Sequence, residues 1–306
     1  MEHVVVVANP AASQFTGGSH RDVMAELART HEVEAQWPGS ATEATEVART
    51  AVADGAKVVV AMGGDGMVHH VAQALVGSDA ALGIIPAGTT NVVARLFAIP
   101  ARPARAAKLI GRDPEPTSMG TARMTLRRGA TETAHHALFA CGFGLDAEVV
   151  RVADSDPYRK YRFGSLHYAR SAFSVGFRSY PSVRPHVDFR AEGHEARGTT
   201  ALVQFRDVYT YFGKIALRFG DDRPEPMSAL ILDRLKRRRI PTIFFSALGH
   251  RDLDKIDGFA LWPNIKHLEL EADPEVPAQA DGESLGLVDG GSVEWAPDSI
   301  RVIAGS

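Results

Sequence analysis

The sequence contains a single cysteine, Cys141, in 306 residues, so it can form no internal disulfide and no cysteine-based zinc site. It has no apolar run near the roughly 18 residues that a membrane-spanning helix needs. Its start, MEHVVVVANP, lacks the basic and long apolar segments of a signal peptide. Neither sign of charge dominates, because 34 Lys and Arg stand against 37 Asp and Glu. We therefore expect a cytoplasmic protein without a transmembrane segment, and we do not expect nucleic acid as a partner.

The charge is unevenly distributed along the chain. Residues 151–240 hold 18 Lys and Arg against 10 Asp and Glu, whereas residues 241–306 hold 4 against 12. One interpretation is that the two segments neutralise each other within one domain. The other is a basic face, including Lys236–Arg239 (KRRR), that contacts phosphate or the periphery of an anionic membrane.

The first 115 or so residues alternate strand and helix signals, with short apolar runs separated by amphipathic segments. The expected strands are Val4–Ala8, Val33–Gln36, Lys57–Ala61 and Leu82–Ile85, and the expected helices are His20–Arg29, Thr42–Ala53, Val68–Val76 and Thr89–Phe97. This order predicts a three-layer α/β domain, in which a mostly parallel sheet is covered by helices on both faces.

Beyond that point the pattern changes to short strand-like stretches separated by turn residues. They are Ala122–Arg127, Ala137–Cys141, Arg184–Arg190, Thr200–Phe205, Ile215–Phe219, Ala229–Leu232, Lys266–Glu271 and Ser292–Trp295, with one helix expected at Gly164–Arg178. We therefore predict two domains. An α/β domain covers residues 1–116, with residues 297–306 packing back on it, and a β-rich sandwich domain covers residues 117–296.

Two glycine-containing turns follow buried strands and precede helices. They are Gly63-Gly64-Asp65-Gly66 and Gly88-Thr89-Thr90-Asn91. Glycine lets backbone N–H groups approach a ligand closely, and the following helix N-terminus adds donors and partial positive charge, which together suit phosphate. An acid in such a loop repels phosphate unless it holds Mg²⁺ or a hydroxyl, so the pattern favours a chemical role for Asp65. The alternatives are a tight turn with Asp65 near the N-cap, and a helix capped by Thr89 or Thr90.

A third candidate is Asp281-Gly282-Glu283, in which two carboxylates lie close together far along the chain from the glycine turns. Asp-Gly is a common pair in hairpin turns, so the alternative is a purely structural turn.

Together these three motifs resemble the bacterial diacylglycerol kinase or soluble lipid kinase family, whose relatives include sphingosine and ceramide kinases. Asn9-Pro10 looks like the opening nucleotide motif of that family, and Ala94-Arg95 follows the second glycine turn. Two later segments, Gly142–Ala147 and Arg162–Tyr168, look like parts of the family's second domain. The resemblance spans nearly the whole chain and preserves the order of the motifs.

This resemblance implies an enzyme that transfers the γ-phosphoryl group of ATP to a lipid hydroxyl, with diacylglycerol as the default acceptor. ATP and Mg²⁺ would bind in the cleft between the two domains. The implied nucleotide-binding residues are Asn9, Gly63, Gly64, Asp65, Gly66, Gly88, Thr89 and Asn91. The implied catalytic residues are Glu283 as the base, Asp65, which also orients Mg²⁺, and Asp281, which orders its loop. The candidates for an acyl-chain cleft, with a core role as the alternative, are Phe173, Phe177, Phe244 and Phe245.

Several positions depart from the family pattern. Met67, His69 and His70 stand where the glycine motif usually continues with Thr and Asn-Glu. Ser118 replaces a common acid, and Pro224-Glu225-Pro226 replaces an Asp-Asp-Gly that supports a structural Mg²⁺ in some members. Two alternatives therefore stay open: a NAD kinase-like phosphotransferase and a catalytically silent nucleotide-binding protein. The sequence leaves the acceptor lipid and a homodimer undecided.

Three other patterns are interpreted as structural. Gly142–Ala147 also fits the G-x-G-x-x-A of dinucleotide sites, but its surroundings indicate antiparallel strands. The adjacent pairs His69-His70 and His135-His136 diverge from one another, unlike metal ligands spaced i, i+4. No G-x-x-x-x-G-K-[ST] segment occurs, which excludes a P-loop site.

Overall fold

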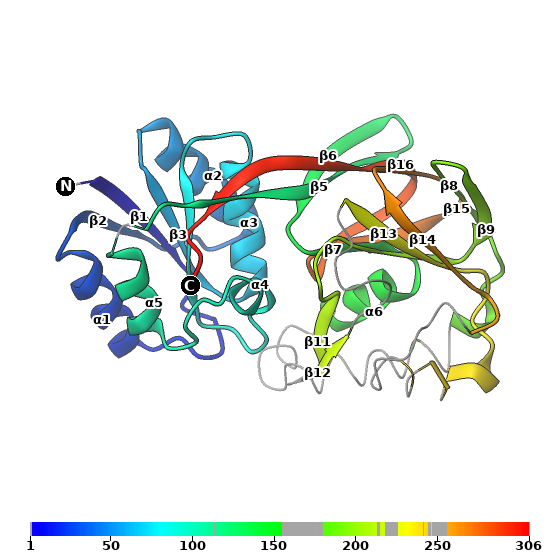
Figure 1. The fold of residues 1–306 in the computed structure, drawn as a ribbon, viewed down its shortest axis with the longest axis horizontal. Coiled ribbons are helices and arrows are strands. Elements are labelled where there is room, and N and C mark those ends of the chain that lie inside the picture. The colour runs from blue at the N-terminus through cyan, green and yellow to red at the C-terminus, as the bar shows by residue number, and fades with distance from the viewer. Residues whose placement is uncertain are drawn as a thin grey trace. The chain divides into compact units, whose positions relative to one another are not determined.

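Figure 1 shows the computed structural model of the chain, which describes residues 2–112, 114–154, 175, 180–212, 215–217, 226–240, 242–243, 246 and 256–305. The chain divides into two compact units, Met1–Thr121 with Pro297–Ser306 (unit 1) and Ala122–Ala296 (unit 2). Some sequence-based expectations lie outside the described residues. They are the motif at 162–168, the helix at 164–178 apart from Val175, Phe173, Phe177, Phe244 and Phe245, and Pro224 and Glu225.

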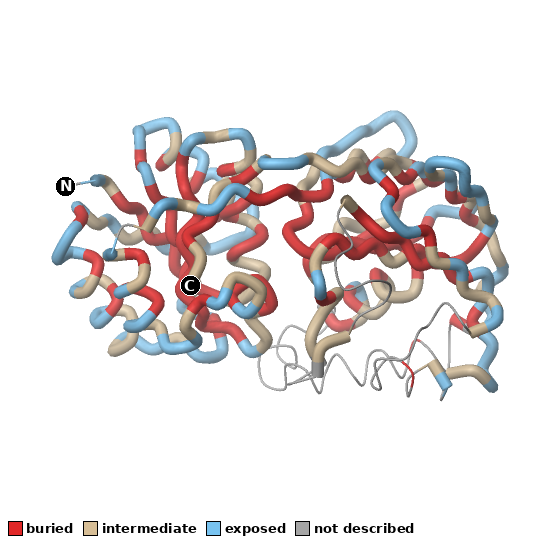
Figure 2. The backbone as a smooth tube through the Cα atoms, viewed as in Figure 1, coloured by how far each residue is buried: buried red, intermediate tan, exposed pale blue. Residues whose placement is uncertain are grey.

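Unit 1 is built on a parallel sheet with the strand order β4, β3, β1, β2. These strands are β1 (Glu2–Ala8), β2 (His31–Gln36), β3 (Val58–Gly63) and β4 (Ala81–Pro86). Every residue of β3 and β4 is buried, as near-continuous apolar runs are when helices cover both faces of a parallel sheet. Figure 2 shows this buried centre of the unit.

Five helices cover the sheet of unit 1: α1 (Gly17–Leu27), α2 (Ala41–Ala53), α3 (Asp65–Leu75), α4 (Val92–Leu96) and α5 (Pro103–Ile110). Helices α2 and α3 pack together and contact β1, β3 and β4, whereas α1 packs with α5 and these two contact β2 and β4. Figure 1 shows the two pairs on opposite sides of the strands. The prediction of a three-layer α/β domain is confirmed.

The last residues of the chain belong to unit 1. Strand β16 (Glu283–Val302) ends beside β4, where Arg301 and Val302 pair in parallel with Ala81 and Leu82. The N–H of Ile303 donates to the Leu82 carbonyl across 3.0 Å. The sheet of unit 1 therefore gains a strand from a segment about 200 residues further along the chain than β4.

Unit 2 is rich in antiparallel strands, as predicted. Its strands other than β16 are β5 (Thr117–Arg128), β6 (Thr131–Ala137), β7 (Ala140–Phe143), β8 (Val187–Ala191), β9 (His194–Gly198), β10 (Thr200–Gln204), β11 (Thr210–Phe212), β12 (Ile215–Leu217), β13 (Met227–Leu232), β14 (Phe259–Ile265) and β15 (His267–Ala280). The main order is β14, β13, β10, β7, β15, β16. The strands enclose a core that includes Phe143, Phe189 and Phe205, each fully buried. The described part of unit 2 also contains the helical segments α6 (Leu145–Asp154), η2 (Tyr180–Ser182) and η3 (Arg237–Arg239).

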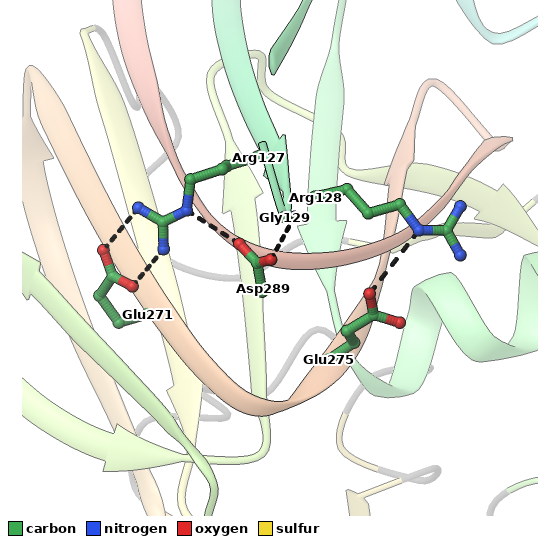
Figure 3. Close-up of polar contacts among 6 residues, drawn as sticks. All are labelled: Arg127, Arg128, Gly129, Glu271, Glu275 and Asp289. Atoms are coloured by element: carbon green, nitrogen blue, oxygen red, sulfur yellow. Dashed lines mark hydrogen bonds and ion pairs between the residues drawn. The ribbon is translucent and has the colours of Figure 1, made fainter. Parts of the chain in front are cut away.

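An ion-pair cluster joins the β5–β6 hairpin to β15 and β16 (Figure 3). The Arg127 guanidinium contacts the Glu271 carboxylate at 2.5 and 3.2 Å, and its Nε donates to Asp289 at 2.8 Å. The N–H of Gly129, in the hairpin turn, donates to the other Asp289 oxygen. That bond and the Arg127 charge hold the pKa of Asp289 below its ordinary value. Exposed pairs of this kind each contribute little to stability, and here they link the hairpin to both neighbouring strands.

Candidate active site

The two glycine turns lie side by side at the carboxyl ends of β3 and β4. Gly63 and Pro86 are register partners, and the N–H of Ala87 donates to the Gly63 carbonyl across 2.8 Å. The next glycines touch through their backbones. A Cβ added to Gly88 would lie 2.5 Å from the Cα of Gly64, and one added to Gly64 would lie 3.3 Å from the Cα of Gly88. A side chain at either position would push the two turns apart, so this close approach requires glycine at both.

Asn9 joins the turns from the end of β1. Its N–H donates to the Met62 carbonyl across 2.9 Å, which continues the pairing of β1 with β3 by one residue. Its side-chain oxygen accepts the N–H of Ala11 across 2.9 Å and so begins the turn that leaves the strand. A Cβ on Gly63 would lie 3.6 Å from the Cβ of Asn9, which places Asn9 directly beside the first glycine turn.

Asn91 closes the second glycine turn. Its Oδ1 accepts the N–H of Gly88 at 3.0 Å, and its Nδ2 donates to the Gly88 carbonyl at 2.8 Å. Asn91 has a φ of 50° and is the N-cap residue of α4, so the alternative that Thr89 or Thr90 caps this helix is wrong. Asparagine tolerates this left-handed conformation better than threonine does, because threonine is β-branched. Thr89 is exposed instead, with its hydroxyl 3.1 Å from that of Ser13.

Asp65 is the first residue of α3, so the first glycine turn is shorter than the sequence suggested. Its Oδ1 accepts the N–H of Val93, in the first turn of α4, across 3.2 Å. Asn91 makes no side-chain capping bond to α4, and Asp65 supplies an acceptor from the neighbouring helix. The N-cap of α3 itself is Gly64, which has no side chain, and Gly66 is half-buried in its first turn. The first-turn N–H groups of α3 therefore receive no bond from an N-cap side chain.

An aromatic cluster at the same edge of the sheet was missed by the sequence analysis. Trp37 directly follows β2, and its ring centroid lies 4.4 Å from that of His20 and 5.8 Å from that of Phe15. Trp37 is 46% exposed and is the one exposed large apolar residue in the described part of the chain. Burial lowers the pKa of His20, which favours the neutral ring. The signal in the sequence was an aromatic residue immediately after a strand of a parallel sheet, where ligands bind.

Asp281 and Gly282 form a two-residue hairpin turn between β15 and β16. Both have positive φ, 54° and 82°, as a type I′ turn requires, and Ala280 pairs with Glu283 across it. The Asp281 carboxylate is buried and turned inward. It accepts the N–H groups of Leu138 at 2.8 and 2.9 Å and of Phe139 at 3.0 Å, between β6 and β7.

Glu283 is the first residue of β16 and is half-buried. It lies in unit 2 with Asp281, whereas Asn9, the glycine turns and Asp65 lie in unit 1. The structure therefore groups the predicted site residues into two sets. One set surrounds the carboxyl ends of β1, β3 and β4, and the other is the β15–β16 turn.

Comparison with known proteins identifies the family. A sequence model of the diacylglycerol kinase catalytic domain matches residues 3–122. The "Diacylglycerol kinase" of Mycobacterium tuberculosis is 46% identical over 69 residues, 22% of each chain. The "Probable lipid kinase YegS-like" of Klebsiella pneumoniae is 30% identical over 243 residues, which are 75% of this chain and 72% of that protein. The chain belongs to the YegS-like lipid kinase family.

The family resemblance inferred from the three motifs is thereby confirmed. This lipid kinase family chain also shares the fold of a candidate diacylglycerol kinase from Bacillus anthracis. That crystal structure superposes with a TM-score of 0.76 at 21% identity, over 99% of this chain and 95% of the other. The chain aligns with only part of the length of the first curated relatives, namely 22% of the mycobacterial enzyme and 55% of a Synechocystis protein.

The structure shows where the residues lie that depart from the usual motif of the lipid kinase family. Met67 packs on the first glycine turn, because a Cβ on Gly63 would lie 2.7 Å from the Cβ of Met67. His69 is buried, and its ring meets that of His70 edge-on with the centroids 5.3 Å apart. Ser118 is exposed in β5. Packing accounts for Met67 and His69, and nothing in the structure explains Ser118.

The residues at the glycine turns fit a magnesium ion held jointly with a nucleotide. In the part of the chain that the structure describes, no three His, Cys, Asp or Glu side chains are grouped to hold a metal by themselves. Mg²⁺ in phosphotransferases is usually bound by one or two carboxylates, and substrate phosphates and water complete its shell. Asp65 brings one carboxylate to the turns and so matches this donor set.

Proposed function

We propose that the protein is an ATP-dependent lipid kinase whose acceptor is diacylglycerol. The observation that carries the proposal is the backbone contact between Gly64 and Gly88 at the carboxyl ends of neighbouring parallel strands. Open α/β sheets bind ligands at this edge, and two touching glycine turns leave backbone donors accessible to phosphate groups. Family membership supports phosphoryl transfer as the chemistry and a lipid as the acceptor.

In this proposal the nucleotide lies along the strand ends of unit 1. Its phosphates contact the glycine turns and the first turn of α3, and Asp65 orients the Mg²⁺–phosphate group. Neighbouring strands are about 4.8 Å apart, so the ends of β2 and β3, two strands apart, are separated by about 10 Å. That separation suits a base stacked on the exposed ring of Trp37 while the phosphates occupy the turns. Asn9, between the two, contacts the ribose or the α-phosphate.

Glu283 is proposed as the general base. Its carboxylate accepts the proton of the lipid hydroxyl while the hydroxyl oxygen forms a bond to the γ-phosphorus. The bond between that phosphorus and the β–γ bridging oxygen breaks, and ADP leaves with the electron pair. Such transfer depends mainly on positioning and on neutralising charge, which are the tasks assigned to the glycine turns and Asp65.

The proposal includes contact with an anionic membrane through the segment Arg234–Arg238, here called the basic loop. The described helices include none that is long and apolar enough to cross a bilayer. Leu235 is buried and anchors the loop, whereas its four cations are exposed. Ser182 and residues 234–237 line a hollow of about 380 Å³, which suits a phosphate-bearing headgroup.

The test is a transfer assay with radiolabelled ATP and Mg²⁺, in which diacylglycerol in mixed micelles and NAD are offered as separate acceptors. Labelled phosphatidic acid supports the proposal. Labelled NADP together with unlabelled lipid would contradict the proposal and support the NAD kinase-like alternative. Nucleotide binding without transfer to diacylglycerol, NAD or a total lipid extract would establish the silent nucleotide-binding alternative.

A further inference from the structure

A buried polar cluster lies directly behind the β15–β16 turn. Gln279, two residues before Asp281, is 4% exposed. Its Nε2 donates to Asp146 Oδ2 at 2.8 Å and to the Tyr209 hydroxyl oxygen at 3.1 Å. Its Oε1 accepts the N–H of Gly282 at 2.9 Å. One amide side chain therefore joins the backbone of the turn to two half-buried side chains from other parts of the chain.

The neighbouring strand β7 leaves space for the Asp146 carboxylate, because it has a glycine at the point of contact. Asp146 lies in the first turn of α6, and a Cβ on Gly142, in β7, would collide with its carboxylate. Gly142 is also the register partner of Gln279, so the amide and the carboxylate meet across the β7–β15 pairing. The Tyr209 hydroxyl donates to the same Asp146 oxygen that Gln279 contacts. The segment Gly142–Ala147 thus contributes Asp146 to this cluster. Its last three residues are the first residues of α6, which packs on antiparallel strands.

The charge of Asp146 determines which way the Gln279 amide faces. An ionised carboxylate only accepts hydrogen bonds, so the NH₂ end of the amide must face Asp146 and the oxygen must face the turn. Only that orientation leaves an acceptor for the N–H of Gly282. A reversed amide would place its oxygen against the carboxylate and its NH₂ against a backbone donor, leaving buried polar groups unsatisfied, each at a cost of about 1–3 kcal/mol.

We propose that Asp146, Tyr209 and Gln279 are positioning residues, which fix the Gln279 amide and through it the backbone of the turn that presents Glu283. The inference rests on the proposed role of Glu283 as base. Asp281 holds one side of the turn through the N–H groups of Leu138 and Phe139, and Gln279 holds the other.

The ionisation of the cluster is consistent with this role. Burial raises the pKa of Asp146 to about 6, and the hydrogen bonds from Tyr209 and Gln279 counteract part of that rise. Burial and the Asp146 charge raise the pKa of Tyr209, which keeps its hydroxyl protonated as a donor. The other titratable groups near this cluster include Cys141 and Tyr180, whose pKa values burial also raises, and Asp281 on the turn itself. At neutral pH Asp146 is therefore ionised and accepts from both neighbours.

The first experiment compares Gln279→Met with the wild-type chain. Methionine fills similar space but cannot accept the N–H of Gly282. Backbone hydrogen exchange should accelerate at residues 281–283, and kcat should fall by about 10-fold or more, since a displacement near 1 Å can cost roughly 10² in rate. The KM for ATP should not change. Normal exchange in this turn, or faster exchange with wild-type kcat, would overturn the inference.

The second experiment uses a variant that can be rescued. In Gln279→Glu, a protonated glutamic acid keeps one donor for Asp146 and one acceptor for the N–H of Gly282, and loses only the second donor, to Tyr209, whereas an ionised one repels Asp146. Two adjacent carboxylates share a proton at a higher pH than either alone. The kcat of the variant relative to wild type should therefore rise as the pH falls from 8 to 6. A constant ratio would contradict the proposed orientation of the amide.

Tyr209→Phe and Tyr180→Phe form the matched pair of controls. The Tyr180 hydroxyl also makes hydrogen bonds, but these go to Thr199 and Thr200 and not to Gln279 or the turn. Faster exchange at 281–283 is expected only for Tyr209→Phe, and an equal effect of both would overturn the inference. The exchange measurement needs no lipid. If the wild-type chain phosphorylates no acceptor, the proposed function fails, while the exchange data still decide whether the cluster holds the turn.

Discussion

The Asp65 carboxylate accepts a hydrogen bond from the N–H of Val93 and so ties the first turn of α3 to the first turn of α4. Each of these helices follows one of the two glycine turns. The bond therefore holds both turns in a fixed relation, in addition to any contact that Asp65 makes with Mg²⁺ and phosphate. Substitutions of Asp65 must therefore distinguish its structural bond to Val93 from its contact with Mg²⁺ and phosphate.

Asp65→Asn is expected to abolish phosphoryl transfer while the fold persists. Asparagine keeps a side-chain oxygen that can accept the N–H of Val93, but it lacks the negative charge that orients Mg²⁺. The melting temperature should stay near that of the wild type, and transfer from radiolabelled ATP should be lost. Undiminished transfer by the folded variant would remove Asp65 from the chemistry.

Asp65→Ala is the matched variant that loses both roles. Removal of a helix-capping acceptor costs about 0.5–2 kcal/mol, so this variant should be less stable than Asp65→Asn by that order. Urea unfolding of the two variants measures the difference. Equal stability would show that the contact with Val93 does not cap α4.

Glu283→Gln should lower transfer by about 10²–10⁴-fold, because general-base catalysis contributes that much and glutamine cannot take the acceptor proton. Since Glu283 is half-buried at the start of β16, glutamine can occupy the same space. Binding of a fluorescent nucleotide analogue should be unchanged, and this serves as the control. Near-normal turnover would refute the role of Glu283 and leave Asp281-Gly282 as a purely structural turn.

Asp281→Ala should destabilise the protein by about 3 kcal/mol or more, as each buried polar group left without a partner costs about 1–3 kcal/mol. The N–H groups of Leu138 and Phe139 lose their acceptor in a buried setting. Asp281→Asn keeps one oxygen and should lose less. Denaturant unfolding gives both values, and a loss below 1 kcal/mol for the alanine variant would show that water replaces the carboxylate.

The basic loop should bind anionic vesicles at low salt. Replacing Lys236, Arg237 and Arg238 by Ala should weaken sedimentation with phosphatidylglycerol vesicles, since each cation near such a surface contributes about 1 kcal/mol. The matched control removes three exposed cations at or beside α5, Arg102, Arg105 and Lys108. Equal binding by the wild type and the loop variant, or an equal loss in both variants, would show that the basic loop is an ordinary solvated surface.

Three strands of unit 1 could be predicted because they are apolar runs followed by glycine, proline or asparagine, whereas β2 (HEVEAQ) gives a weaker pattern. The expected Val4–Ala8, Lys57–Ala61 and Leu82–Ile85 lie within or beside β1, β3 and β4. Helix α5 was missed, although Pro103 at its start and the apolar face formed by Ala106, Ala107 and Ile110 are both helix signals. The start of α3 was placed too late because its N-cap is glycine, whereas capping rules look for a polar side chain.

In unit 2 the prediction of antiparallel strands was correct, but their lengths and partners were not available from local pattern. Only the first part of β15 was expected, since Pro274 and Pro277 interrupt its alternation. Helix α6 was missed altogether, because Gly142–Ala147 was interpreted from its glycine pattern and not as the start of a helix. The Asp281 carboxylate binds backbone groups 143 positions earlier in the chain. Contacts this distant depend on the completed fold, and no spacing rule finds them.

The return of β16 to unit 1 also determines the order in which the protein can mature on the ribosome. Strands β1 to β4 are synthesised before unit 2, whereas the strand that pairs with β4 is synthesised after it. Synthesis of the intervening 175 residues takes roughly 10–35 s at 5–20 residues per second. During that interval the exposed edge of β4 is an open strand, and the glycine turns sit on a sheet that is not yet closed. The sheet of unit 1 is thus completed only after unit 2 has been synthesised.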